Sequence, residues 1–181
     1  MRTLKRLFLF LLSLLVILAL ISFLLPQKQH IERSTSIAAS TGDVYSYISN
    51  PKSFHQWSPW AKLDPAMQYQ FTGPESGEGT GMRWQSQQAN VGNGSWVITR
   101  AEENQSIEMA MDFDDQGTAT SFFRLQPAGD TTKITWGFDT DAGMNPVMRW
   151  FGLLMDSMVG NEYEKGLATL KKMIEGKQAP A

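Results

Sequence analysis

The stretch Ser106–Asp114, "SIEMAMDFD", decides the fold class because the character of its side chains alternates strictly. The apolar members are Ile107, Met109, Met111 and Phe113, and each is separated from the next by an acidic or small residue. A period of two places all the apolar side chains on one face of a β-strand. One apolar face and one wet face are typical of antiparallel sheets. The stretch therefore predicts an antiparallel strand that covers a core.

Five similar stretches lie on either side of this strand, between Met67 and Asp141. They are "MQYQF" (67–71), "GMRWQSQ" (81–87), "SWVITRAE" (95–102), "TSFFRLQ" (120–126) and "TKITWGFDTD" (132–141). Short segments rich in glycine, asparagine, aspartate or proline separate them, at the spacing of hairpins. The six strands are therefore predicted to form an antiparallel meander.

The flanks of the meander supply a further strand and the helices. "HIERSTSI" (30–37) alternates and is rich in β-branched residues, which predicts a first strand. Ser40–Asp43 is a helix start signal, and Asn50–Pro51 opens a second short helix that ends near Trp57. Asn145–Pro146 opens a long helix with apolar residues at steps of three and four, and Gly176 is its predicted stop.

These elements predict one α+β domain in which a seven-stranded, curved antiparallel sheet wraps around the long C-terminal helix. The sheet must bury its apolar face, and only that helix is long enough to cover it. A strongly twisted sheet that grips one helix leaves a wedge of space between them. A ligand site is expected in that wedge.

The N-terminus carries a separate apolar segment, "LFLFLLSLLVILALISFLL" (7–25), which has no charged residue. At about 1.5 Å per residue it reaches about 28 Å, close to the thickness of a bilayer core. A signal peptide is the alternative, because Arg2, Lys5 and Arg6 precede the segment. We favour an uncleaved anchor, because the run is long and no small-x-small cleavage site follows it.

The basic residues ahead of the span place the N-terminus in the cytoplasm and the domain outside, in the periplasm if the source is bacterial. The expected organisation is a transmembrane anchor over residues 1–26, a ligand-binding domain over 27–175 and a flexible tail over 176–181.

Charge and composition exclude several classes of site. The chain has 16 basic and 18 acidic residues, and three of the basic ones precede the span, so the outer domain is acidic. Without a Lys/Arg cluster it is a poor nucleic-acid binder. The absence of cysteine excludes disulfides and thiolate chemistry. Paired histidines, HExxH and phosphate loops are also absent, so neither a metal nor a cofactor is expected.

The inward row of the sheet supplies the predicted ligand-binding residues. They are Met82, Trp84, Met109, Met111, Phe113, Trp136 and Phe138 on the strands, facing Phe151 and Met155 on the last helix. Methionine adapts well to a ligand of irregular shape, although an ordinary packed core would use the same residue types. Glu162 is the preferred polar site residue, paired with a strand arginine, and the alternative is a solvated helix edge. Glycines inside the helix, at positions 152, 160 and 166, indicate close approach to the sheet or to a ligand.

"SFHQWSPWAKLDP", Ser53–Pro65, holds a histidine and two tryptophans. His55 could act as a general acid or base, since its ordinary pKa of about 6.5 suits proton transfer. No carboxylate lies close in the sequence to orient it, so we favour a position on the exposed side of a short helix and assign no catalytic residue. Trp57 and Trp60 are expected to cap the mouth of the wedge, where they either contact a ligand or seal the core.

Several of these segments resemble the START-like, or helix-grip, superfamily, and in particular its polyketide cyclase/dehydrase and lipid transport branch. The resemblance rests on "VYSYISNPKSFHQWSPW", "GEGTGMRWQS", "VGNGSWVIT" and the terminal "FGLLMDSMVGNEYEKGLATLKKMIE". It covers nearly all of residues 30–175. It implies a helix-grip fold, and the superfamily includes lipid carriers, hormone receptors, cyclases, dehydrases and chaperone activators.

The favoured hypothesis is a membrane-anchored domain that binds a hydrophobic small molecule or lipid without covalent chemistry. A cyclase- or dehydrase-like enzyme is the first alternative, since holding reactive groups together requires few catalytic residues. The second alternative is a protein-interaction module that docks a membrane partner through its tryptophans. The identities of the ligand and of any protein partner are not predicted.

Overall fold

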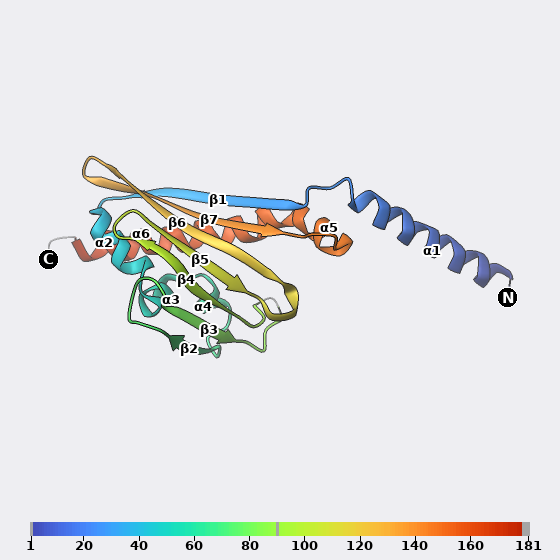
Figure 1. The fold of residues 1–181 in the computed structure, drawn as a ribbon, viewed down its shortest axis with the longest axis horizontal. Coiled ribbons are helices and arrows are strands. Elements are labelled where there is room, and N and C mark those ends of the chain that lie inside the picture. Colours follow the sequence, from blue (N-terminus) through green and yellow to red (C-terminus); the bar gives the residue numbers. More distant parts are fainter. Residues whose placement is uncertain (1, 90, 179–181) are drawn as a thin grey trace.

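One curved sheet and one long helix make up the domain, and a separate helix projects from its N-terminal side (Figure 1). The computed structural model describes residues 2–89 and 91–178. Its strands are β1 (Lys28–Ile37), β2 (Gln68–Thr72), β3 (Gly81–Gln85), β4 (Gly94–Glu102), β5 (Ser106–Asp112), β6 (Thr118–Ala128) and β7 (Thr131–Asp141). Its helices are α1 (Arg2–Ser22), α2 (Thr41–Ile48), α3 (Pro51–Trp57), α4 (Trp60–Leu63), α5 (Pro146–Met155) and α6 (Asn161–Gln178), with a 3₁₀ turn, η1 (Asp114–Gln116), and a π turn, η2 (Asp156–Gly160).

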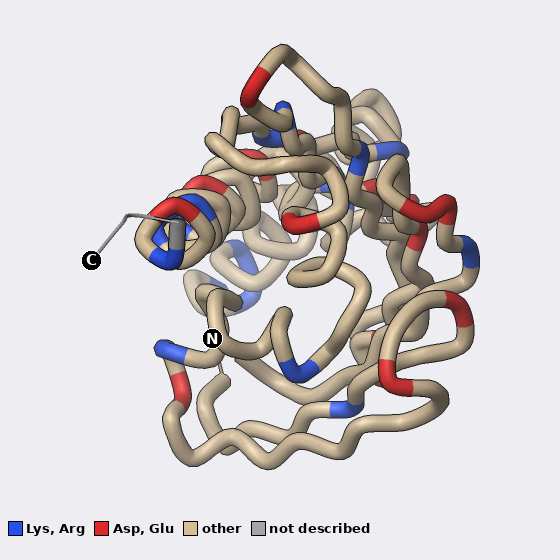
Figure 2. The backbone as a smooth tube through the Cα atoms, turned by 90° about the vertical axis from the view of Figure 1, so that its left-hand side faces the viewer, with Lys and Arg blue, Asp and Glu red and all other residues tan. Residues whose placement is uncertain are grey.

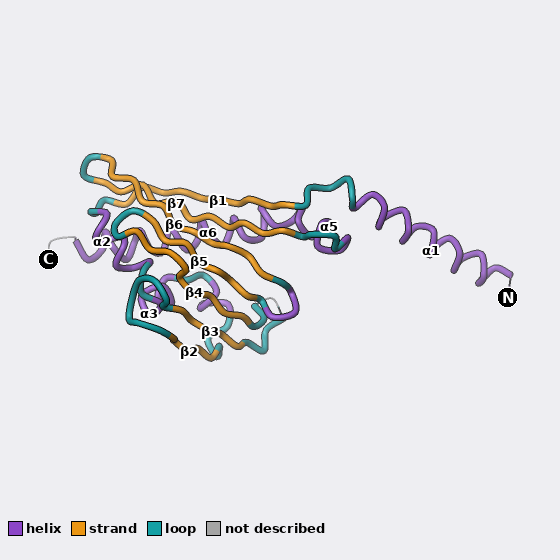
Figure 3. The backbone as a smooth tube through the Cα atoms, viewed as in Figure 1, coloured by secondary structure: helices purple, strands orange, loops and turns teal. Residues whose placement is uncertain are grey.

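The strands form a single antiparallel sheet in the order β1-β7-β6-β5-β4-β3-β2. The meander from β2 to β7 and the first strand at its edge are therefore confirmed. Figure 3 shows how the strands fan out from β1 and β7 toward β2. Viewed from one end, the sheet curves around the inner space, and basic and acidic residues are mixed over that side (Figure 2).

Side-chain caps start the helices where the sequence predicts them. Ser40 accepts a hydrogen bond from the Asp43 amide (3.1 Å), and Asn50 accepts one from the Lys52 amide (2.9 Å). Asn145 caps α5 by accepting from the Val147 amide (3.0 Å). Each cap satisfies a backbone donor that has no partner inside its helix. The one-turn helix α4 was not predicted.

The C-terminal helix differs from the prediction in two respects. It is divided into α5 and α6 by the π turn η2 rather than running without interruption. It also continues past Gly176 to Gln178, so Gly176 is not its stop. Gly176 does not have the positive φ of a C-terminal cap. The predicted tail over 176–181 lies in part outside the described residues.

Helix α6 approaches the inner face of the sheet closely. Its buried side chains are Tyr163, Leu167, Leu170 and Ile174. A Cβ atom at Gly166 would lie 2.9 Å from Trp136 Cζ3, so only glycine permits this approach. The predicted close approach of the helix glycines to the sheet is confirmed, and the helix-grip fold follows from it.

Helix α1 lies outside this core. It has 21 residues, and Ser22 at its end is the only one that is buried. At about 1.5 Å per residue its length is about 31 Å, enough to cross a bilayer core. The chain thus has one N-terminal helix that is long and apolar enough to span a membrane.

Candidate functional site

Two neighbouring cross-strand rows on the inner face differ sharply in burial. Antiparallel pairing joins Ile31, Phe138, Ser121, Met109 and Ile98 in one row, and all five are buried. We call this the closed row. Two residues along each strand, pairing joins Gln29, Thr140, Ala119, Met111, Trp96 and Met82 in a second row. In this open row the first four side chains are only partly buried, so the inner face is incompletely covered at the end from which α1 departs.

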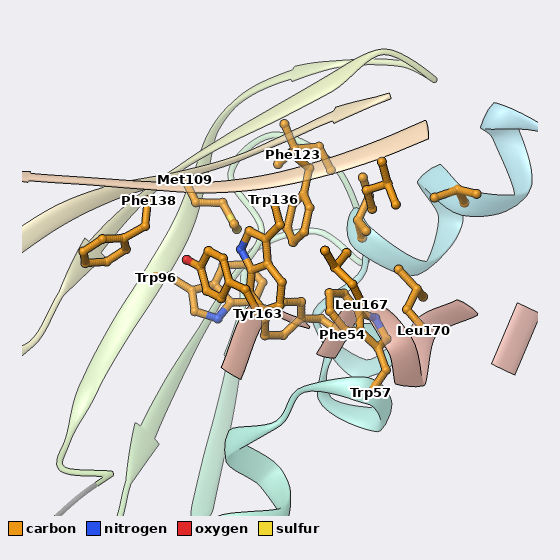
Figure 4. Close-up of a cluster of buried hydrophobic side chains, with 14 of the residues drawn as sticks. Phe54, Trp57, Trp96, Met109, Phe123, Trp136, Phe138, Tyr163, Leu167 and Leu170 are labelled. Carbon is orange, nitrogen blue, oxygen red and sulfur yellow. The ribbon is translucent and has the colours of Figure 1, made fainter. Parts of the chain in front are cut away.

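The core beyond the closed row is filled with stacked aromatic rings (Figure 4). Trp136 and Tyr163 stack with their ring centroids 3.8 Å apart and their planes 9° apart. Trp57 is fully buried with its ring centroid 5.2 Å from that of Trp136, and half-buried Trp60 lies 5.8 Å from the same ring. Trp57 at the end of α3 and Trp60 at the start of α4 therefore help to seal the core. Trp57 is not available on the surface to dock a partner.

Three polar groups inside this core satisfy one another. Trp136 Nε1 donates to Ser121 Oγ (3.1 Å), and Ser121 Oγ donates to the Gly137 carbonyl (2.9 Å). The Tyr163 hydroxyl lies 3.4 Å from the same Oγ. Burial raises the pKa of Tyr163 far above its usual range, so the hydroxyl stays protonated. The cluster pins α6 to the sheet and leaves no free acid or base.

The open row is bordered by apolar groups from both the sheet and the helix. Phe113 is half-buried, with its ring centroid 6.4 Å from that of Phe138, and Val159 in the π turn is half-buried as well. Met155 is buried at the end of α5. In Figure 4, Phe138 lies well apart from the Trp136–Tyr163 stack. Incompletely buried apolar groups therefore lie on strands β5–β7 and at the place where the helix changes its path.

Trp96 is a site residue that the sequence did not reveal. Its side chain is buried in the open row, and its Nε1 has no hydrogen-bond partner among the described residues. Buried donors in native proteins are nearly always paired, so an unpaired one calls for an explanation. An indole N–H of this kind can donate to a carbonyl or hydroxyl group of a bound molecule. The alternation in β4 could have placed Trp96 on the inner face beside Met82.

The structure brings together most of the predicted ligand-binding residues. Those on the inner face are Met82, Trp84, Met109, Met111, Phe113, Trp136, Phe138 and Met155. Phe151 is separate from them, because it lies on the exposed face of α5. Glu162 forms an ion pair with Lys165 on its own helix (2.6 Å) rather than with a strand arginine.

An ion pair between a strand arginine and the C-terminal helix does exist, but it is made by Arg33 on β1 and does not involve Glu162. The Arg33 guanidinium donates to Asp156 (3.0 Å), the first residue of the π turn, and to Glu164 (2.8 Å) in α6. The hydrogen bond from Arg33 lowers the pKa of Asp156, which therefore stays ionised. Gly160 packs directly against this guanidinium, so a side chain there would displace it. Arg33 thus holds the helix at the point where its geometry changes.

A hollow with a volume of about 1080 Å³ lies along the same part of the strands as the open row, and all six residues of that row contribute to its lining. Its lining comes from the sheet, and most of it consists of residues that alternate with the buried positions, among them Lys28, His30, Thr72, Arg83, Ala110, Asp112, Thr120 and Asp139. It therefore opens on the face of the sheet that is turned away from the C-terminal helix. There His30 Nδ1 lies 2.6 Å from Asp139 Oδ1, and this hydrogen bond raises the pKa of His30. The hollow is open, and its lining mixes charged and hydroxyl groups with apolar residues such as Val97 and Ala110.

His55 and Glu162 would be the acid–base residues of the enzyme hypothesis, and they lie on different elements. The His55 ring packs edge-on against Tyr69, with centroids 4.2 Å apart. Burial lowers the pKa of His55, and its Nδ1 has no partner among the described residues. Neither residue lines the large hollow. Among the described residues, no group of three or more His, Asp or Glu side chains is arranged to hold a metal ion.

Comparison with known families and structures identifies this arrangement. A family model described as "Polyketide cyclase / dehydrase and lipid transport" matches residues 28–175. No curated protein matches the chain significantly.

Several solved structures share the fold. A norcoclaurine synthase mutant from Thalictrum, in complex with a transition-state analogue, has a TM-score of 0.64 at 13% identity, over 84% of this chain and 97% of that one. The Aha1 dimer from Colwellia psychrerythraea gives 0.58 at 13% identity, over 81% and 96%. CalU16 from Micromonospora echinospora gives 0.54 at 19% identity, over 85% of each chain. At these identities the likeness establishes the fold.

Proposed function

The chain belongs to the polyketide cyclase/dehydrase and lipid transport family, and we propose that it binds a hydrophobic small molecule or lipid between its sheet and its C-terminal helix while α1 anchors it in a membrane. The ligand enters at the open row. The anchor leaves the domain outside the cytoplasm, in the periplasm of a bacterium. The binding requires no covalent step, no metal and no cofactor.

The observation that carries this proposal is the contrast between the open row and the closed row. Apolar area left exposed forgoes about 25 cal/mol per Å² of stabilisation. Met111 and Ala119 keep part of their surface uncovered, although Met109 and Ser121, two residues away on the same strands, are buried. A bound hydrocarbon would bury that surface.

Trp96 supports a ligand that has one polar end. Its Nε1 is buried and has no partner among the described residues, and Trp96 is the direct cross-strand neighbour of Met111 in the open row. A carbonyl or hydroxyl group accepting from Nε1 would remove the cost of a buried unpaired donor, which is about 1–3 kcal/mol. Fatty acyl esters, sterols and polyketides all carry such a group on an apolar body.

The test fills the open row with a side chain and compares the result with a matched substitution on the other face. Ala119→Phe places a phenyl group in the open row. Ala110→Phe places the same group on the adjacent strand, but on the opposite face of the sheet, because Ala110 pairs with Thr120 and not with Ala119. The full chain, reconstituted in phosphatidylcholine nanodiscs, is photolysed with a diazirine-bearing fatty acid, and cross-linked residues are mapped by mass spectrometry.

We expect cross-links near Met111 and Phe113 in the unmodified chain, reduced about tenfold by Ala119→Phe, which corresponds to a loss of about 1.4 kcal/mol of binding. Ala110→Phe should leave them unchanged. The proposal fails if Ala110→Phe removes the cross-links and Ala119→Phe does not, because the ligand would then lie on the outer face of the sheet. It also fails if no cross-link forms inside the domain.

A further inference from the structure

Helix α5 presents an apolar face without charge to the outside. Val147, Leu153 and Leu154 are 71%, 53% and 57% exposed. Met144 before the helix and Met158 after it are also exposed, and so are Trp150 and Phe151. We call these seven residues the α5 face. Apolar patches of this kind mark sites of contact with proteins or membranes.

The only charged residue of α5 is withdrawn from this face. Arg149 is 6% exposed. Its Nε and Nη2 donate to the Gly143 carbonyl (3.0 and 2.8 Å), and its Nη1 donates to the Phe23 carbonyl (3.2 Å). The guanidinium also lies 5.3 Å from the centre of the Phe23 ring. These contacts satisfy the buried charge and tie α5 to the segment just after α1.

A second contact fixes the level of α5 along α1. Trp150 Nε1 donates to the Leu18 carbonyl (3.1 Å), one helical turn before α1 ends at Ser22. At about 1.5 Å per residue, Leu18 lies about 6 Å inside the end of the apolar helix. Amphipathic helices that rest on membranes bury their apolar face about 5–10 Å into the boundary between headgroups and acyl chains, and tryptophan is enriched at that level.

We propose that the α5 face lies in the lipid–water interface of the bilayer that α1 spans, as a second and peripheral membrane contact of this chain. The inference rests on the proposed anchoring by α1. A lipid surface fits better than a second protein, because Arg149 and Trp150 hold α5 against the end of the apolar helix α1, and Phe23 and Leu24 just after that helix are exposed apolar residues. Figure 1 shows α5 at the end of the domain from which α1 departs.

The placement also concerns the ligand. Gly152 of α5 packs against the Gln29 side chain, which is the first member of the open row. With α5 in the interface, the mouth of the open row faces the bilayer surface. A molecule with an acyl chain can then pass between bilayer and domain without crossing water, so membrane lipids are the substrate class that this geometry favours.

The experiment uses single cysteines, which the natural chain lacks. Leu154→Cys carries an NBD fluorophore on the α5 face, and Leu63→Cys carries it on α4, another exposed leucine away from α1. Leu11→Cys reports on the anchor itself. The full chain is reconstituted in phosphatidylcholine vesicles with and without doxyl-labelled lipid, and NBD emission is recorded.

We expect NBD at Leu154 and at Leu11 to be blue-shifted and quenched by the doxyl lipid, and NBD at Leu63 to behave as in water. Quenching at Leu11 with none at Leu154 would overturn the α5 inference and leave the anchor intact. Loss of quenching at Leu11 would instead overturn the anchoring in the proposed function. If the labelled Leu154→Cys chain shows no quenching and an unlabelled sample of the same variant forms disulfide-linked dimers, the face belongs to a second copy and the inference is also overturned.

Discussion

The two halves of the C-terminal helix meet the same sheet in different ways. In α6 the apolar side chains Tyr163, Leu167, Leu170 and Ile174 are buried against the sheet. In α5 the buried positions are Arg149, Gly152 and Met155, and most apolar side chains point outward. The π turn between them accounts for the change, because one extra residue rotates a helix by about 100°. The half that packs on the sheet stabilises the fold, and the other half leaves apolar side chains exposed for the contacts with ligand and lipid that we propose.

The largest expected effect is a difference in the free energy of unfolding between a substitution in the aromatic core and one in the open row. Trp136→Ala removes a buried ring that stacks on Tyr163, and it should lower the free energy of unfolding by about 3–5 kcal/mol. Met111→Ala acts on a half-buried side chain and should cost about 1 kcal/mol. Urea unfolding of the full chain in nanodiscs, followed by circular dichroism, measures both.

Equal costs for the two substitutions would contradict the division, because the open row would then be part of the packed core. The comparison becomes sharper if bound fatty acid stabilises the unmodified chain and not Met111→Ala, since only a ligand at the open row couples binding to that residue.

A smaller effect distinguishes two glycines of α6. Gly166 touches Trp136, and a Cβ atom there would also lie 3.1 Å from Pro59 Cδ. Gly166→Ala should therefore destabilise the fold by about 1–3 kcal/mol through overpacking. At Gly176 no atom lies within 4 Å of the added Cβ. Gly176→Ala should stabilise the helix by about 0.5–1 kcal/mol.

Both variants can be measured by thermal unfolding of the full chain. If Gly166→Ala were as harmless as Gly176→Ala, the helix would not be pressed against the sheet in the closed half. The contrast between the two halves of the helix would then lose its basis in packing.

The same contrast explains how far the sequence alone could predict this protein. The alternation of β5 is strict, because one face of the strand meets water and the other does not, so the strands and their antiparallel order could be predicted. The irregularity between Ile98 and Arg100 in β4 and the burial of Phe122 on the outer face of β6 could not. The helix caps are local hydrogen bonds and could be predicted as well. The approximate extent of the C-terminal helix could be predicted, but which residues of its first half face the sheet could not.

An uninterrupted C-terminal helix, as the sequence predicts it, would place Phe151 on the inner face. The π turn breaks the α-helical period between Phe151 and the residues of α6. The structure places Gly152 and Arg149 on the inner face, because α5 approaches Gln29 closely and because carbonyl groups of other segments accept from Arg149. Neither contact has a local pattern in the sequence. The unpaired Nε1 of Trp96 was hidden for the same reason, since a missing hydrogen bond shows only when all neighbours are in place.

The smallest expected effect concerns the two histidines, which lie in the two contrasted regions. The hydrogen bond to Asp139 raises the pKa of His30 at the open end of β1, whereas burial lowers the pKa of His55 on α3, which packs on the closed side. NMR titration of the full chain should give a pKa above 6.5 for His30 and below 6.5 for His55. Asp139→Asn should return the pKa of His30 toward 6.5 and leave that of His55 unchanged.

The contributions of the two histidines to stability depend on pH in opposite directions. The contribution of His30 is complete below pH 6.5, the pKa of the unfolded state, and is lost as the pH rises through the higher folded-state pKa. The contribution of His55 is complete above pH 6.5 and is lost as the pH falls through the lower folded-state pKa. His30→Gln should therefore flatten the stability profile only on the alkaline side of 6.5, and His55→Gln only on the acid side. Both profiles changing on the same side would mean that the two histidines share one environment, contrary to the separation of a solvated open end from a sealed core.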